Sequence, residues 1–254
     1  MQHADGGAVV PDIPRVQDQL FDRRSSARQK YASLVVGRPG LGALLKYELT
    51  ILASQSVPGA LGLALRKILY RRLLGSCGRN VVFGHNVVLR HPHKSRIADD
   101  VVIDDNCLRD AKGEGNRGIT IGSGVFIGRN TILSCKNGDI EIGDRANFGF
   151  NCEIFSASLV SIGADALFAA YCYVIGGGHD FTDPSRSVSE QGRHSAGVRM
   201  GEGVWMGAGA KVFDGVTIGA HAIVGAGAVL TVPVPERGVA MGRPARIVGT
   251  RDAV

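Results

Sequence analysis

The chain has 254 residues, of which 44% are hydrophobic and 20% are charged, and a formal net charge of +6. This length supports one large domain with its own core, and the frequent aliphatic residues exclude a disordered chain. The 36 glycines follow no period of three, which excludes a collagen-like helix. The first 30 residues hold no apolar signal segment, and no stretch is apolar enough to span a bilayer, so we expect a cytoplasmic protein.

The N-terminal part is predicted to contain a tail and two helices. Residues 1–30 are polar and are expected to be mobile. Residues 39–54 place four leucines on one helical face, and a second helix is expected to begin near Pro58 and to bury an apolar face. The first set is Leu41, Leu45, Leu49 and Leu52, and the second is Leu61, Leu65, Ile68 and Leu69. We expect residues 31–80 to form a basic helical segment that caps the domain after it.

Basic residues are concentrated in this part of the chain. Residues 15–96 contain 15 Lys and Arg against three Asp and Glu, a net +12, so the rest of the chain carries −6 of the overall +6. These residues are not interleaved with stacking aromatics, so nucleic acid is not the expected partner. Two explanations stay open: the segment only caps the domain, or it also contacts an anionic membrane, through pairs such as Arg66–Lys67 and Arg71–Arg72.

An aliphatic residue recurs at every sixth position over the last third of the chain. The series is Met200, Met206, Val212, Ile218, Val224 and Leu230, and small or β-branched residues follow four positions later. The same period recurs upstream, in blocks that begin at Ile97, Ile121, Ile142 and Ile162. A hexapeptide period predicts a parallel β-helix, in which the aliphatic side chains stack inside. We place this β-helix at residues 81–232, with a C-terminal cap and tail at residues 233–254 and an insertion, RDAKGEGNRG, between Ile103 and Ile121.

The five cysteines are an odd number and form no CxxC pair, so they support neither a disulfide framework nor a metal site. Cys107, Cys152 and Cys172 occupy the small-residue position of the repeat. We therefore expect them to be buried packing residues and not catalytic thiolates.

Several segments resemble the hexapeptide-repeat acyltransferases. These are ITIGSGVFIGRNTI, IEIGDRANFGFNCEI and the long segment VRMGEGVWMGAGAKVFDGVTIGAHAIVGAGAVL. Within that superfamily, GVWMGAGAKVFDGVTIG and VAMGRPARIV are similar to the maltose, galactoside, polysaccharide and xenobiotic O-acetyltransferases. The resemblance covers about residues 80 to 250. It implies an all-β fold, a left-handed parallel β-helix, with an N-terminal helical segment, assembled as a homotrimer that uses acetyl-CoA as co-substrate.

The repeat is interrupted between Val174 and Met200 by a polar segment, which we predict to be a catalytic loop over residues 175–199. His179 stands where the family carries its catalytic histidine, and a neutral imidazole can take the proton of an attacking hydroxyl. We expect Asp180, beside it, to contact the acceptor. His194, later in the loop, matches no family role and is expected to matter less.

Three further residues are candidates for acceptor binding. Asn147 and Asn151 flank Gly149, which occupies the position of an asparagine that holds the acceptor sugar in the family. Either could contact the acceptor, or both could complete turns. Trp205 is expected either on the wall near the thioester or packed beneath the loop.

The coenzyme is expected to lie against the C-terminal coils. The two GAGA segments there have almost no side chains and permit close approach of a pantetheine arm. The predicted contacts are Gly207, Ala208, Gly209, Gly225 and Ala226. Arg243 and Arg246, in GRPAR, are candidates for the nucleotide phosphates, and solvated arginines are the alternative.

Four rival functions are less consistent with the sequence. A γ-class carbonic anhydrase needs three converging histidines, and a sugar nucleotidyltransferase needs an N-terminal phosphate-binding loop. A serine acetyltransferase needs a longer helical domain, and a noncatalytic β-helical scaffold subunit would have no use for His179. We predict an acetyl-CoA-dependent O-acyltransferase that acts on a saccharide or glycoconjugate in a ternary complex. N-acylation of an amino sugar and acetylation of a xenobiotic stay open, as does the acyl chain length.

Overall fold

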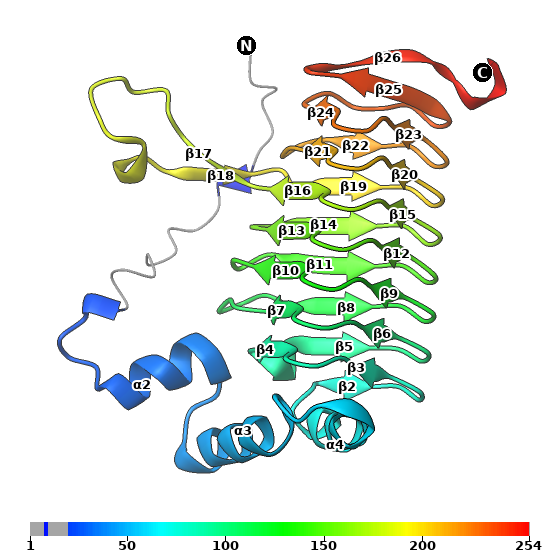
Figure 1. The fold of residues 1–254 in the computed structure, drawn as a ribbon. Helices are drawn as coiled ribbons and strands as arrows, with labels where there is room; N and C mark the ends of the chain where they lie inside the picture. The colour runs from blue at the N-terminus through cyan, green and yellow to red at the C-terminus, as the bar shows by residue number, and fades with distance from the viewer. Residues whose placement is uncertain (1–7, 10–19, 254) are drawn as a thin grey trace.

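The computed structural model describes residues 8–9 and 20–253. Short parallel strands stack into a triangular β-helix, and helices lie at its N-terminal end (Figure 1). The strands of the β-helix form three sheets of seven, nine and seven strands, and successive coils of the chain contribute a strand to each sheet in turn. A fourth sheet of three strands, β1 (Ala8–Val9), β18 (Arg193–Ser195) and β17 (Gly178–His179), lies outside the β-helix. The predicted fold class, a parallel β-helix with an N-terminal helical segment, is confirmed.

Sheet 1 contains β2 (Ser76–Cys77), β5 (Ser95–Ile97), β8 (Ile119–Ile121), β11 (Asp139–Ile142), β14 (Leu159–Ile162), β19 (Val198–Met200) and β22 (Thr217–Ile218). Sheet 2 contains β3 (Val82–Phe83), β6 (Val102–Ile103), β9 (Phe126–Ile127), β12 (Asn147–Phe148), β15 (Leu167–Phe168), β20 (Trp205–Met206), β23 (Ile223–Val224), β25 (Gly238–Gly242) and β26 (Ala245–Thr250). Sheet 3 contains β4 (Val88–Arg90), β7 (Leu108–Asp110), β10 (Ile132–Cys135), β13 (Glu153–Ser156), β16 (Tyr173–Gly176), β21 (Lys211–Val212) and β24 (Val229–Leu230).

Three edges join these sheets, and two of them carry the predicted site residues. The turns from sheet 2 to sheet 3 form the glycine edge, which includes Asn151, Gly207–Gly209 and Gly225–Gly227. The connections from sheet 3 to sheet 1 of the next coil form the loop edge, which includes residues 91–94, 111–118, 136–138 and 177–197. Turns from sheet 1 to sheet 2 form the third edge, where Arg145 lies.

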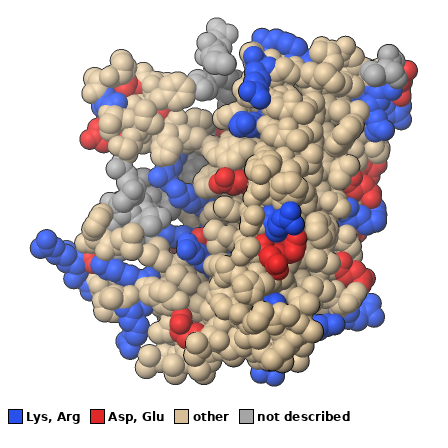
Figure 2. All heavy atoms as spheres, viewed as in Figure 1, with Lys and Arg blue, Asp and Glu red and all other residues tan. Residues whose placement is uncertain are grey.

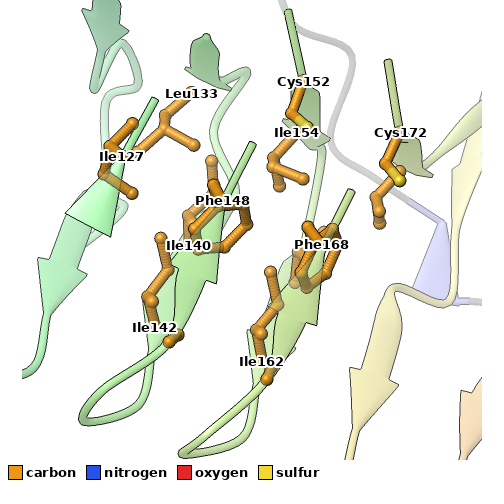
Figure 3. Close-up of a cluster of buried hydrophobic side chains, with 14 of the residues drawn as sticks. Ile127, Leu133, Ile140, Ile142, Phe148, Cys152, Ile154, Ile162, Phe168 and Cys172 are labelled. Carbon is orange, nitrogen blue, oxygen red and sulfur yellow. The ribbon is translucent and has the colours of Figure 1, made fainter. Parts of the chain in front are cut away.

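The aliphatic positions of the repeat form the core. From Met200 to Leu230, all six are buried, with at most 4% of their surface exposed. Equivalent residues of neighbouring coils stack on one another: the centroids of the Phe148 and Phe168 rings are 4.5 Å apart, with 25° between the ring planes, and Ile142 lies beside Ile162 (Figure 3). The small positions are buried as well, including Cys107, Cys152 and Cys172, as predicted. Burial raises the pKa of Cys107 to about 11, which keeps its thiol protonated and unreactive.

The N-terminal helices are α2 (Ala27–Tyr31), α3 (Leu41–Ser54) and α4 (Gly59–Leu69), with the π-helix η1 (Ala32–Val36) and the 3-10 turn η2 (Tyr70–Arg72). They cover the first coil through two buried tyrosines. The Tyr47 hydroxyl donates to the Leu89 carbonyl at 2.8 Å, and the Tyr70 hydroxyl donates to the Val87 carbonyl at 2.9 Å. Within the described part of the chain, no helix combines the length and the hydropathy that crossing a bilayer requires.

The prediction that α4 buries a leucine-rich face is wrong. Leu61 and Ile68 are 65% and 56% exposed, Leu65 and Leu69 are only half-buried, and the buried residues of α4 are Gly62 and Arg66. Position 62 faces inward and lies against the Val57 carbonyl oxygen, with which any side chain there would collide. The Arg66 guanidinium follows on the same face and donates to the carbonyls of Phe83, Ser54, Gln55 and Val57. The hydrogen bonds of Arg66, more than the burial of leucines, hold α4 against the first coil.

The leucines of α3 also point outward. Leu41, Leu45, Leu49 and Leu52 share one helical face, as predicted, but they are 56%, 56%, 63% and 83% exposed. The opposite face carries the buried Tyr47, Thr50 and Ser54. Of the basic pair Arg66–Lys67, which was a candidate for membrane contact, only Lys67 is exposed, because Arg66 is buried.

Residues 177–197, which interrupt the β-helix between β16 and β19, form a β-hairpin with an extended tip. It contains β17 (Gly178–His179), the 3-10 turn η4 (Val188–Glu190) and β18 (Arg193–Ser195), and it projects from the solenoid in Figure 1. The strand β1 (Ala8–Val9) pairs antiparallel with β18, so these two residues of the predicted tail are placed in a sheet. For residues 27–30 the prediction of a mobile tail is wrong, because they form the start of α2, which is capped by the Ser26 side chain. The part of that prediction for residues 1–7 and 10–19 lies outside the described residues.

Candidate active site

The candidate base His179 lies on the loop edge, in the first strand of the hairpin. It is exposed, and it is paired with Arg193 in the antiparallel register of β17 and β18. Residues directly opposite each other in such a pair project to the same face, so the His179 and Arg193 side chains share a face. The base of the hairpin is anchored, because the Ser195 hydroxyl lies 3.0 Å from the Gly176 carbonyl and 2.7 Å from the Ser158 hydroxyl.

Asp180 and His194 form a pair that the sequence did not reveal. The His194 Nδ1 atom lies 2.8 Å from the Asp180 carboxylate. A carboxylate only accepts hydrogen bonds, so His194 Nδ1 is the donor in this contact. This ring lies against Gly178, where an added Cβ would be 3.0 Å from Nε2. The two residues are far apart in sequence, and only the hairpin register brings them together.

The predicted coenzyme residues fall on the glycine edge in successive coils. Backbone hydrogen bonds link these turns: Gly209 N–H donates to the Ala170 carbonyl at 2.9 Å, and Gly227 N–H donates to the Ala208 carbonyl at 2.7 Å. Gly209 has a φ of +69°, which favours glycine, whereas a Cβ on Gly207 would lie 2.5 Å from the Ala226 nitrogen. Coil packing alone therefore accounts for both glycines, and the same packing keeps this edge free of bulky side chains.

The two arginines lie at the C-terminal end of the β-helix. Arg243 continues the glycine edge, and its Nε donates to the Gly227 carbonyl at 2.7 Å. Arg246 is in the antiparallel hairpin of β25 and β26, where it pairs with Met241 and donates to its neighbour's carbonyl. Both are exposed, so both are accessible to an anion, but Arg243 is the one aligned with the glycine edge.

The acceptor candidates lie on two different surfaces. Asn147 and Trp205 occupy one outward column of sheet 2, separated by Leu167. This column is partly apolar, since Phe126, Leu167 and Trp205 are 37%, 47% and 48% exposed. Asn151 is in a turn of the glycine edge with a φ of +56°, and its N–H donates to the Arg129 carbonyl. Asn151 therefore completes a turn.

One chain does not bring these groups together. His179, Asp180 and Arg193 lie on the loop edge, the coenzyme candidates lie on the glycine edge, and Trp205 faces outward from sheet 2 between the glycine edge and the third edge. A site that uses all of them requires the loop edge of one chain to meet the glycine edge of another.

A cavity in the described part of the chain lies away from His179. It has a volume of about 670 Å³ and lies at the lower end of the loop edge, between the N-terminal helices and residues 91–114. Arg28, Arg38 and Lys94 line it, with Glu114 as its acidic residue. Among the described residues, no group of three His, Cys, Asp or Glu side chains is placed to hold a metal ion.

The stacked hexapeptide coils define the chain as a β-helix protein of the hexapeptide-repeat type. It is 30% identical over 134 residues to the "Probable acetyltransferase Rv3034c" of Mycobacterium tuberculosis, a match that covers 53% of this chain and 45% of that protein. It is also 30% identical over 129 residues to the galactoside O-acetyltransferase of Escherichia coli, which covers 51% of this chain and 62% of that protein. The predicted resemblance to hexapeptide-repeat acetyltransferases is thus confirmed. The matches span 45% and 62% of the lengths of these two relatives, and no family model matches the chain.

Solved structures share the fold at low identity. The polySia specific acetyltransferase NeuO aligns with a TM-score of 0.50 and 21% identity, over 68% of this chain and 84% of that chain. AntD, an N-acyltransferase from Bacillus cereus in complex with dTDP and 3-hydroxybutyryl-CoA, aligns with a TM-score of 0.50 and 20% identity, over 78% of this chain and 90% of that chain.

Proposed function

We propose that this chain is an acetyl-CoA-dependent O-acyltransferase that acts on a saccharide or glycoconjugate. The observation that carries the proposal is His179, held by a hairpin on the loop edge of a hexapeptide β-helix. The glycine edge, with its run of residues that lack large side chains, supports the coenzyme site. The similarity to a galactoside O-acetyltransferase supports a sugar hydroxyl as the acceptor.

Acyl transfer from a thioester to a hydroxyl requires a general base, and it does not require a nucleophile on the protein. A thioester is already an activated acyl donor, and the buried cysteines of the repeat leave direct transfer as the simplest route. His179 takes the proton of the acceptor hydroxyl while its oxygen attacks the thioester carbonyl carbon. The tetrahedral intermediate then expels the CoA thiolate, which recovers the proton from the imidazolium. Backbone N–H groups that face the carbonyl oxygen would stabilise its developing negative charge.

Replacement of His179 by Ala tests this role. We expect turnover to fall by about 10²–10⁴-fold, the usual contribution of a general base, with the affinity for CoA unchanged in calorimetry. Turnover is measured as free thiol released from acetyl-CoA, with hydroxyl sugars, amino sugars and xenobiotic alcohols offered as acceptors. His194→Ala is the comparison, and we expect it to lose less. A larger loss from His194→Ala would assign the base to the Asp180–His194 pair instead.

We further propose that the functional unit is a homotrimer. The loop edge and the glycine edge of one chain face different directions, and a neighbouring chain in closed threefold symmetry would bring one of each together at every interface. The exposed Phe126, Leu167 and Trp205 on sheet 2 supply apolar surface that such an interface could cover.

The partners that we propose also include an anionic membrane, contacted from the cytoplasmic side. The leucines of α3 are exposed, and so are Lys46 in the same helix and Lys67, Arg71 and Arg72 at and after the end of α4. In Figure 2, Lys and Arg lie over the N-terminal helices at the lower left, beside a largely uncharged surface. An amphipathic surface of this kind binds at the interface of anionic bilayers by combined apolar burial and charge attraction.

A further inference from the structure

The cavity at the lower end of the loop edge is built by contacts between the N-terminal segment and the first coils. Its volume of about 670 Å³ lies in the range of small-molecule pockets, about 300–1,000 Å³. The His91 N–H donates to the Val35 carbonyl at 2.8 Å, and the His91 Nε2 atom lies 2.9 Å from the Ser33 carbonyl. Lys94 Nζ donates to the Asn116 side chain at 2.8 Å. These hydrogen bonds hold η1 and two segments of the loop edge in place around the cavity.

The charged side chains that line the cavity are three cations and one carboxylate, a net +2: Arg28, Arg38, Lys94 and Glu114. Lys94 is already engaged in hydrogen bonds; burial lowers its pKa, and the charges of Asp139 and Glu114 oppose that shift. Arg28 and Arg38 are exposed, and neither guanidinium forms a hydrogen bond or an ion pair with any described residue. A guanidinium binds phosphate oxygens through two parallel hydrogen bonds, so these two arginines are the groups that can hold an anion here.

Two further features of the cavity favour an anion. The N-terminus of α3 opens on it, because Leu41 lines the cavity and no side chain caps this helix, which leaves the positive end of the helix dipole there. His93 packs near Gly37, which is in the lining. Burial lowers the pKa of His93 to about 4, and the charges of Arg38 and Lys94 lower it further. The region therefore disfavours an additional positive charge.

The exposed leucine face of α3 begins at this cavity. Leu41 and Leu44 line the cavity, and Leu41 is also the first of the four exposed leucines, which continue along one side of the helix as Leu45, Leu49 and Leu52. A basic cavity with an apolar strip that runs from its rim fits a ligand with a charged headgroup and hydrocarbon chains. A soluble phosphate ester would fill the cavity and leave the leucines in water.

We propose that this cavity binds the phosphate headgroup of a membrane lipid, with Arg28 and Arg38 on the phosphate and the leucine face of α3 against the acyl chains. This inference rests on the proposed membrane contact, and it adds a defined lipid site to a general attraction between charges. A phosphomonoester is the class of headgroup that fits best, because its charge of about −1.5 to −2 near pH 7 matches the net charge of the lining. A phosphodiester lacks the second ionisation.

Vesicles of phosphatidylcholine that contain either phosphatidic acid or phosphatidylglycerol separate this site from general charge attraction. Phosphatidic acid is a phosphomonoester and phosphatidylglycerol is a phosphodiester, and their mole fractions are set so that both surfaces carry equal charge. We expect wild type to bind the phosphatidic acid vesicles at least about 10-fold more tightly, in keeping with charge-assisted hydrogen bonds. Arg28→Gln/Arg38→Gln should lose this preference and still bind phosphatidylglycerol. Circular dichroism checks that the variant is folded.

Lys67→Gln/Arg72→Gln is the matched control, because it removes the same charge from exposed positions outside the cavity. It should weaken binding to both vesicles and keep the preference. Glycerol 3-phosphate, measured by calorimetry, tests whether the phosphate comes from a lipid. Wild type should bind it at least about 10-fold more weakly than phosphatidic acid in vesicles, because it makes no contact with the leucine face. Leu45→Gln/Leu49→Gln/Leu52→Gln should bind glycerol 3-phosphate like wild type.

Four results would overturn the inference. Equal binding of the two vesicles by wild type would leave only general charge attraction, with the proposed membrane contact intact. A preference for phosphatidic acid that persists in Arg28→Gln/Arg38→Gln would place the lipid elsewhere. A loss of affinity for CoA in that variant would assign the cavity to coenzyme phosphates. Failure of wild type to bind either anionic vesicle would contradict the membrane contact itself, and binding of glycerol 3-phosphate alone would then make the cavity a site for a soluble phosphate ester.

Discussion

Arg109 places a guanidinium inside the solenoid. It occupies an inward position of β7, level with Leu89 in the coil below and Leu133 in the coil above, and only 1% of its surface is exposed. Among the described residues, none accepts a hydrogen bond from its three nitrogens. Burial lowers its pKa to about 10. A buried charge without a partner destabilises the folded state, so this position lowers the stability of the solenoid.

We expect Arg109→Leu to stabilise the fold by about 1–4 kcal/mol, the range seen when buried charges are replaced by apolar residues. The measurement is the free energy of unfolding from denaturant titration at neutral pH. The folded-state pKa lies below the unfolded-state value, so the penalty is complete below about pH 10 and declines as the pH rises from there toward the ordinary pKa of an arginine. The advantage of the variant should shrink over the same interval.

Arg66→Leu is the matched control for this prediction. Both arginines are 1% exposed, but the Arg66 guanidinium donates to four backbone carbonyls. Its removal leaves those carbonyls without donors and should destabilise the fold by several kcal/mol. Destabilisation by Arg109→Leu of similar size would mean that Arg109 is satisfied by a group such as a buried anion.

Arg109 also shows where the sequence pattern fails. It follows Ile103 by six residues and so keeps the register of the repeat, yet its charge makes it look like the first residue of the insertion RDAKGEGNRG. The aliphatic positions were predictable because every coil imposes the same interior on them. A polar residue in that position carries no such signal, and neither does the Asp180–His194 contact, which depends on the register of one hairpin.

At the level of elements, the helices were predictable and the direction of their faces was not. The leucine spacing in α3 indicates a helical face, but periodicity does not tell whether the solenoid or another surface meets it. The first coil is instead contacted through Tyr47, Tyr70 and Arg66, whose polar groups reach backbone carbonyls at the open end of the β-helix. Carbonyls at the end of the β-helix have no neighbouring coil to donate to them, so they accept hydrogen bonds from polar side chains of the helices. The leucine face of α3 stays exposed.

The exposed leucine face should bind anionic vesicles. In sedimentation assays at low salt, we expect the wild-type protein to bind vesicles that contain phosphatidylglycerol and not to bind vesicles of pure phosphatidylcholine. Leu45→Gln/Leu49→Gln/Leu52→Gln should weaken binding by at least about 10-fold through lost apolar burial. Lys67→Gln/Arg71→Gln/Arg72→Gln should weaken it through lost charge, with Arg66 kept because it is structural.

Two exposed residues at the other end of the molecule provide the control. Ile247 and Val248, in β26, are 43% and 60% exposed, and their replacement by Gln should leave vesicle binding unchanged. If wild type ignores anionic vesicles even at low salt, the helices only cap the solenoid. If the leucine variant instead changes the mass in light scattering, the leucine face is an interface between subunits.

For the whole molecule, the separation of the loop edge from the glycine edge is the feature that decides how many chains a site needs. If the site is shared, light scattering should give three times the 26.7 kDa chain mass. Mass alone does not show a shared site, since a trimer could also hold three independent ones. Complementation between two inactive variants separates these cases.

The first variant is His179→Ala, which removes the proposed base from the loop edge. The second is Ala208→Trp, which fills the glycine edge at an exposed position and leaves the backbone hydrogen bond from Gly227 in place. Each alone should be inactive, and Ala208→Ser should be active as the control for a change at that position. When the two variants are refolded together in equal amounts, a shared site is intact whenever an unmodified loop edge meets an unmodified glycine edge. Random assembly makes this true of about a quarter of the interfaces, so about a quarter of wild-type activity should return. No recovery from mixed trimers would mean that each chain holds both groups in one site, and the role assigned to the glycine edge would then be wrong.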